Sequence, residues 1–132
     1  MIARLFGMSL VVAAAGALAG TAHAHHSLQA GFDITKTETV SGAITSMEWR
    51  NPHAWLHIEV KDEKGQVTPY AIEFSSANAL YRRGWRQDDL PVGSSITVTG
   101  YVARDGTRTL TANEVKLPDG RTLFGGANTG AQ

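Results

Sequence analysis

Histidine supplies most of the chemistry that this chain can offer, and four of its five histidines stand in two short stretches, His25-His26 and His53 to His57. Imidazole nitrogens bind copper, zinc and other transition metals, so these stretches predict a metal site. A leader cut after Ala24 would leave His25 at the mature N-terminus, where its α-amine and imidazole together form a chelate that suits Cu(II). His26 would add a second imidazole, and a further nitrogen from the body of the protein would complete a T-shaped site of three nitrogens.

The nitrogen from the body of the protein can come from His53 or His57. Both lie in the stretch HAWLHIEV, whose alternation predicts a β-strand with the two histidines on one face. Positions four apart on a strand are separated by about 13 Å, which is too far for both imidazoles to reach one ion. We therefore expect one of them to join the site. We favour His53, because it follows Asn51-Pro52 at the start of the strand, where an N-terminal arm can fold over it.

Met47, Trp49 and Trp55 allow a different metal site beside the same strand. A thioether together with imidazole suits Cu(I), and the face of a tryptophan ring can cover a cation. Met47 and Trp49 share one strand face, as do His53 and Trp55, so the two sets would form a cluster if their strands pair on that side. The alternative is that Trp55 and its histidines form a half-exposed strand face that the helix or the tail covers.

A second candidate site lies in the segment from Glu73 to Trp85, where Arg82 and Arg83 stand beside aromatic residues. Guanidinium groups bind carboxylates and phosphates in a fork and stack on rings. Arg82, Arg83 and Trp85 can therefore hold an anionic envelope component or a partner protein. The alternative is structural: the arginines end a short helix, where cations are favoured, and Trp85 plugs the open end of a barrel.

Composition and missing motifs exclude several functions. Twelve basic and twelve acidic side chains, spread along 132 residues, argue against a nucleic-acid partner, which usually requires a basic stripe. The sequence has no cysteine, no glycine-rich phosphate loop, no nucleophile elbow and no HExxH pair. A common hydrolytic mechanism is therefore not expected. A copper oxygenase would need only the histidine site, so oxidative chemistry stays open, while a non-catalytic binding protein is favoured.

The first 24 residues are typical of a secretory leader. Arg4 supplies a positive charge, an apolar run follows, and Ala22-His23-Ala24 has the small residues that signal peptidase accepts. The apolar run is shorter than the roughly 20 residues that a bilayer span needs, which argues against a membrane anchor. We expect a periplasmic or secreted protein with no membrane span after cleavage at Ala24. A cut after Ala22 would leave His23 in front instead.

Short strands separated by turn residues must position these side chains. The pattern predicts a helix over residues 77–83, capped by Ser75-Ser76, and five strands, over residues 39–49, 53–60, 66–74, 95–102 and 109–117. Gly42 and Gly100 fall where strands must bend. Asn113-Glu114 interrupts the apolar pattern of the last strand, so a bulge is expected there.

Three strands, a helix and two more strands is the order of the OB-fold, a five-stranded partly open barrel. The sequence therefore predicts an all-β domain with one short helix. An open five-stranded sheet with a helix across one face would have a similar pattern. The expected organisation is a signal peptide (1–24), an N-terminal arm (25–36), the barrel (37–120) and a loose glycine-rich tail (121–132).

Several segments together resemble a known group of proteins: the N-terminal HHS, MEWRNPHAWLHIEV, EFSSANALYRRGW and VTGYVARDGTRTLTANEVKLPDGR. They are similar to a family of small exported proteobacterial proteins that is catalogued as a domain of unknown function. The resemblance implies a periplasmic or secreted single domain with no assigned activity and no agreed ligand. The chain also resembles periplasmic OB-fold proteins in general, some of which bind copper and others envelope components.

We therefore expect an exported module that carries or delivers a metal ion, copper in the first place, through His25, His26 and one of His53 and His57. The alternative is a non-catalytic OB-fold domain that binds an envelope component or a protein. The sequence indicates no particular protein partner.

Overall fold

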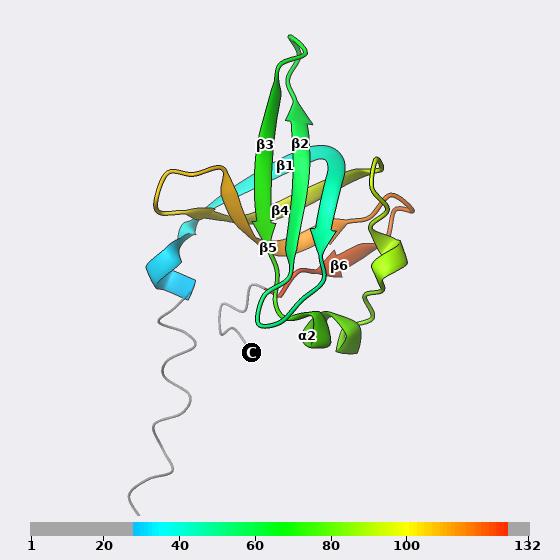
Figure 1. The fold of residues 1–132 in the computed structure, drawn as a ribbon. Helices are drawn as coiled ribbons and strands as arrows, with labels where there is room; N and C mark the ends of the chain where they lie inside the picture. The colour runs from blue at the N-terminus through cyan, green and yellow to red at the C-terminus, as the bar shows by residue number, and fades with distance from the viewer. Residues whose placement is uncertain (1–27, 127–132) are drawn as a thin grey trace, which may run out of the picture.

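The computed structural model describes residues 28–126, so the predicted leader, His25, His26 and residues 127–132 lie outside the described part. Residues 28–31 form a helical turn. The elements that follow (Figure 1) are β1 (Phe32–Glu48), β2 (Trp55–Lys61), β3 (Val67–Glu73), α2 (Ala77–Arg82), the 3-10 turn η1 (Gln87–Asp89), β4 (Ser95–Ala103), β5 (Thr109–Lys116) and β6 (Thr122–Phe124).

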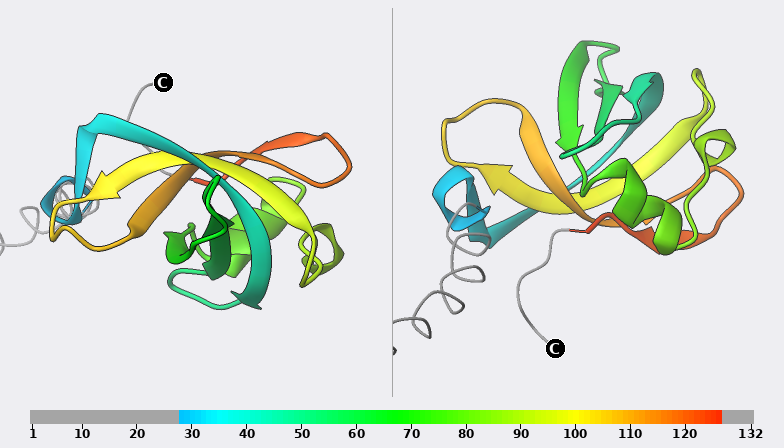
Figure 2. Two further views of the ribbon diagram at one scale, coloured as in Figure 1. Left: turned by 90° about the horizontal axis from the view of Figure 1, so that it is seen from above. Right: turned by 60° about the horizontal axis from the view of Figure 1, so that its bottom comes forward.

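Five of the strands form a closed ring, which Figure 2 shows from two further sides. The long strand β1 pairs with β4 through its first part and with β2 through its last part. β3 continues from β2 and β5 from β4, all antiparallel. A parallel pairing of residues 71–73 with residues 109–111 closes the ring between β3 and β5. This closure confirms the predicted five-stranded OB-fold-like order and excludes the open sheet.

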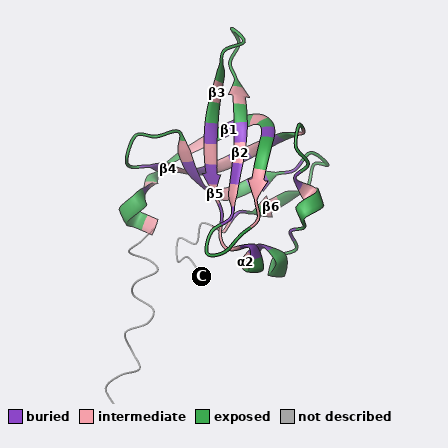
Figure 3. Cartoon of the chain, viewed as in Figure 1, coloured by how far each residue is buried: buried purple, intermediate pink, exposed green. Residues whose placement is uncertain are grey.

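Alternation along the strands builds the core. Leu56 and Ile58 of β2 and Ile72 of β3 have relative exposures of 0%, 1% and 0%, whereas the residues between them face outward. Because successive side chains of a strand point to opposite faces, one apolar row per strand fills the ring. Figure 3 shows these buried rows along the middle of β2 and β3.

Two glycines allow the strands to cross closely. A Cβ on Gly42 would lie 2.9 Å from the carbonyl carbon of Glu59 and overlap its oxygen, and a Cβ on Gly100 would meet the backbone of Thr111 in the same way. These are the positions where the sequence predicted bends. Glycine is required there because the neighbouring backbone occupies the space of a side chain.

The register of the ring shifts at three places, one of them in the pairing of β1 with β4, between Asp33 and Thr37. In β5, Glu114 pairs with Thr99 and Ala112 with Gly100, so Asn113 is the extra residue, as predicted. In β1, Ile44 pairs with Ile58 and Ser46 with His57, so Thr45 is extra.

The helix α2 begins after Ser76, whose side chain accepts a hydrogen bond from the amide of Ala79 at 3.2 Å. Its apolar side is buried through Ala77 and Leu80. Trp85 follows and is fully buried, with its ring edge-to-face against Phe74 at 5.4 Å. The predicted helix and cap are present, and Trp85 lies in the core.

The boundaries of the ring differ from the expected ones. β1 begins at Phe32, inside the predicted arm, and residues 122–124, expected in a loose tail, form β6 against β5. Two hydrogen bonds hold the residues at and after β6 in place. The indole of Trp85 donates to the Phe124 carbonyl at 3.0 Å, and the Ser75 amide donates to the Gly125 carbonyl at 3.2 Å. No helix within residues 28–126 has the length and apolar character to cross a bilayer.

Candidate functional site

The outward face of β1, β2 and β3 is centred on Trp55. Glu48 of β1 and Glu73 of β3 pair with Trp55 from either side, so the three side chains form one row across the strands. His53 and His57 stand two residues before and after Trp55, on the same face of the chain. The face is therefore a tryptophan framed by two histidines and two carboxylates, which we call the Trp55 face.

His53 is fixed by two acceptors. Its Nδ1 lies 2.9 Å from Oε1 of Glu73 and 3.2 Å from the carbonyl oxygen of Phe74. Because a carboxylate and a carbonyl can only accept, Nδ1 carries the proton and donates to them. In the neutral ring Nε2 then keeps its lone pair, and the side chain is 53% exposed.

His57 uses the other ring nitrogen for its contact with a carboxylate. Its Nε2 lies 3.1 Å from Oε1 of Glu48, and Oε2 of the same carboxylate pairs with Arg50 at 3.1 Å. Nε2 is therefore the donor, and the lone pair of the neutral ring is on Nδ1, the nitrogen nearer the backbone. The two histidines thus belong to two separate pairs with carboxylates.

Glu73 is the most enclosed charge of the Trp55 face, with 17% of its side chain exposed. Burial raises the pKa of Glu73, and the positive charge of protonated His53 offsets part of the rise. This carboxyl therefore takes up a proton more readily than an exposed glutamate does.

The bulge at Thr45 decides which β1 residue meets Trp55. Without the extra residue, the pairing of Ile44 with Ile58 would continue and place Met47 opposite Trp55. With it, Met47 pairs with Leu56, on the inner side, and Glu48 takes the place opposite Trp55. The expected cluster of Met47 with the histidines is therefore not formed.

The other predicted residues lie elsewhere. Trp49 packs partly buried against the core, edge-to-face on Tyr81 at 5.4 Å, and not on the Trp55 face. Arg82 and Arg83 are exposed at the end of α2. Trp85 is buried and cannot contact a ligand at the surface. The predicted arginine and tryptophan group is thereby separated into a surface pair and a core residue.

A shallow groove of about 820 Å³ extends from His57 to the turn between β4 and β5, where Arg108 stands. Arg108 lies over the ring of Tyr70 at 5.9 Å, and the Tyr70 hydroxyl donates to Glu38 at 2.8 Å. Burial, together with the hydrogen bond to Glu38, raises the pKa of Tyr70. The groove leaves one side of the Trp55 face open to a larger ligand.

Within residues 28–126, no three histidine or acidic side chains converge on a point where they could hold a metal ion. The predicted ligands His25 and His26 lie outside that range. Sequence reasoning named both histidines of the face but missed Glu48. The role of Glu73 beside His53 was also missed, because both contacts depend on pairing across strands.

Comparisons with known proteins give a family and a likeness to solved structures. A model described as "Family of unknown function (DUF6152)" matches residues 12–112. Among solved structures, the chain is similar to the dimeric N-terminal domain of PriB protein from Thermoanaerobacter tencongensis, at 18% identity and a TM-score of 0.45, covering 63% of this chain and 96% of that one. Comparison with curated proteins finds no match.

Proposed function

The chain belongs to the DUF6152 family, whose function is unknown, and we propose from its own residues that it is an exported metal-binding module that carries or delivers copper. The proposed ligands are the mature N-terminal His25, the adjacent His26 and the imidazole of His53. This set provides the nitrogen donors that copper prefers.

The arrangement of His53 is the observation that supports this proposal. Histidines that bind metals almost always donate their other ring N–H to a carboxylate or a backbone carbonyl, which sets the tautomer and the direction of the ring. His53 donates to both kinds of acceptor, with Nδ1 at 2.9 Å from Glu73 and 3.2 Å from the Phe74 carbonyl. The lone pair of its Nε2 is then free and oriented to bind a metal ion.

His57 is the weaker candidate for the same role. It uses Nε2 to contact Glu48, so its lone pair would be on Nδ1, close to its own strand. A metal ion that is held by another segment reaches Nε2 of an imidazole more easily than Nδ1, which is nearer the backbone. His57→Ala therefore serves as the matched control for His53→Ala, because both changes remove one half-exposed histidine with a glutamate partner.

Copper titration of the exported protein tests the proposal. The chain is expressed with its complete N-terminal segment, the first residue of the exported form is identified by mass spectrometry, and Cu(II) binding is measured by competition with a chelator. We expect submicromolar binding with a stoichiometry of one, lost in His25→Ala and weakened in His53→Ala. Glu73→Gln is expected to weaken binding by about 10- to 100-fold, because it replaces the charged carboxylate that orients His53 with a neutral amide.

Three results would contradict the proposal. The exported chain could begin after His26, so that neither N-terminal histidine remains. Binding could be no tighter than micromolar. His57→Ala could reduce affinity as much as His53→Ala does, which would show that copper follows histidine content and not this site.

A further inference from the structure

The outer side of α2 and the residues after it form a cationic surface whose side chains differ from those of the Trp55 face. α2 buries Ala77 and Leu80. It lies at the base of the molecule in Figure 1, and Figure 3 colours its other residues mainly as exposed. The surface consists of the exposed side chains Tyr81, Arg82, Arg83 and Arg86 with Trp49 beneath Tyr81, and we call it the arginine face.

Within residues 28–126, the charges of the arginine face have no carboxylate partner. All twelve acidic residues of the chain fall within residues 28–126, yet within that range none lies within ion-pair distance of Arg82, Arg83 or Arg86. Three other arginines do contact carboxylates, at 3.1, 3.9 and 2.7 Å: Arg50, Arg104 and Arg121. The nearby Asp89 accepts from the backbone amide of Arg86 and from Arg121.

Neutral groups hold the guanidinium groups of Arg83 and Arg86 in place. Arg86 donates through Nη1 to the carbonyls of Trp85 at 2.6 Å and Tyr81 at 3.2 Å, and its guanidinium lies 5.6 Å from the centre of the Tyr81 ring. Arg83 donates to the Ser75 hydroxyl at 3.3 Å. A cation that is positioned without a carboxylate partner keeps its full attraction for an external anion.

An aromatic layer lies under the cations. Tyr81 is 41% exposed and contacts Trp49 edge-to-face at 5.4 Å. The indole N–H of Trp49 is buried and has no hydrogen-bond partner within the described residues. Arginine with exposed aromatic rings is the combination found in the energetically important centres of protein interfaces.

The number of charges indicates the class of partner. Anionic lipid surfaces are typically bound by clusters of about 4–8 Lys or Arg, and nucleic acids by longer basic stripes. The arginine face has three arginines without a carboxylate partner in the described part of the chain, and the whole chain has equal numbers of basic and acidic residues. We propose that the arginine face docks an acidic segment of a partner protein, whose carboxylates bind the guanidinium groups in a fork. This site shares no residue with the proposed copper ligands, so either proposal can fail alone.

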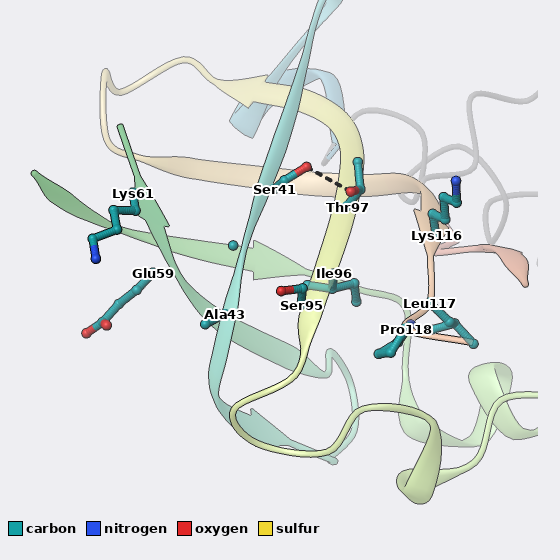
Figure 4. Close-up of a pocket in the computed structure, with 11 residues that line it drawn as sticks. Ser41, Ala43, Glu59, Lys61, Ser95, Ile96, Thr97, Lys116, Leu117 and Pro118 are labelled. Atoms are coloured by element: carbon teal, nitrogen blue, oxygen red, sulfur yellow. Dashed lines mark hydrogen bonds between the residues drawn. The ribbon is translucent and has the colours of Figure 1, made fainter. Parts of the chain in front are cut away.

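Binding of a dye-labelled oligoglutamate peptide to the exported full chain tests this docking site. We expect saturable binding at low salt that weakens by about tenfold or more in the triple variant Arg82→Gln, Arg83→Gln, Arg86→Gln. The control variant Lys61→Gln, Lys64→Gln, Lys116→Gln removes the same charge elsewhere. Figure 4 shows Lys61 and Lys116 at opposite ends of an open groove of about 470 Å³, pointing away from each other. This control is expected to retain the affinity within about twofold.

Two further variants distinguish forked hydrogen bonding from simple charge attraction and test whether a loss of binding is caused by unfolding. Arg82→Lys with Arg83→Lys keeps the charge but removes the planar fork, so we expect weaker peptide binding with an unchanged melting temperature. Arg82→Gln with Arg83→Gln leaves the carbonyl contacts of Arg86 intact and should weaken binding in a folded protein. Equal losses in the arginine and lysine triple variants would overturn the proposal. So would full affinity in the lysine-substituted double variant, absence of peptide binding, or binding to phosphatidylglycerol vesicles without binding to the peptide.

Discussion

Glu73 illustrates how a single residue couples stability to the proposed site. Its side chain is only 17% exposed, and it accepts a hydrogen bond from Nδ1–H of His53 at 2.9 Å. The cost of enclosing its charge outweighs the attraction of His53, so the pKa of Glu73 is raised. The same enclosed position therefore disfavours the ionised carboxylate of Glu73 and orients the imidazole of His53.

The sign of this effect predicts the pH dependence of stability. A folded-state pKa above the unfolded value of about 4.5 means that the contribution of Glu73 is fully present below that pH and is lost as pH rises through the folded value. The unfolding free energy of the wild type minus that of Glu73→Gln should therefore fall as pH rises above about 4.5. Urea unfolding at several pH values measures this difference, and a constant or rising difference would show that burial is not the dominant cause.

At the scale of elements, alternation was readable in the sequence and register was not. The apolar row of β2 and the helix cap at Ser76 follow from local patterns, and both are confirmed. The bulge at Asn113 was predicted because an amide and a carboxylate interrupt an apolar pattern. The bulge at Thr45 was missed, because threonine fits a strand as well as any residue. That one residue exchanges Met47 for Glu48 opposite Trp55 and so changes the chemistry of the face.

The crossing of β1 over β2 makes a prediction for Gly42. Gly42→Ala would place a Cβ against the backbone of Glu59, so the strands must separate, and we expect the unfolding free energy to fall by about 2 kcal/mol or more. Gly31→Ala is the control, because no heavy atom lies within 4 Å of its added Cβ, and it should change stability by less than about 1 kcal/mol. Tryptophan fluorescence during urea unfolding measures both variants. Similar losses in the two would indicate a general sensitivity of glycine positions instead of a close backbone approach.

For the whole molecule, segments distant in the sequence complete the ring. β3 and β5 close it through residues 71–73 and 109–111, and β6 adds an acceptor for the buried indole of Trp85. The order of strands was predictable because each has its own apolar pattern. The place of β6 was not, since its contribution is made by backbone atoms, which a Gly-rich sequence does not reveal.

Removal of the terminal strand tests the role of β6. Deletion of residues 122–132 leaves the Trp85 N–H without its partner and should lower the unfolding free energy by more than about 2 kcal/mol, because an unsatisfied buried donor alone costs about 1–3 kcal/mol. Phe124→Ala keeps the carbonyl acceptor and changes a side chain that is 70% exposed, so we expect a change within about 0.5 kcal/mol. Chemical denaturation compares the two. If the deletion is as mild as the point substitution, β6 does not contribute to the stability of the ring.

The parallel closure also determines when the domain can fold during synthesis. A ribosome delivers residues 71–73 well before residues 109–111, so a nascent chain that holds only β1 to β3 cannot cover its apolar row. Until β5 emerges, Leu56 and Ile72 remain accessible to chaperones or to a translocation machinery that handles unfolded polypeptides. Folding of this protein is therefore expected to follow the release of nearly its whole chain.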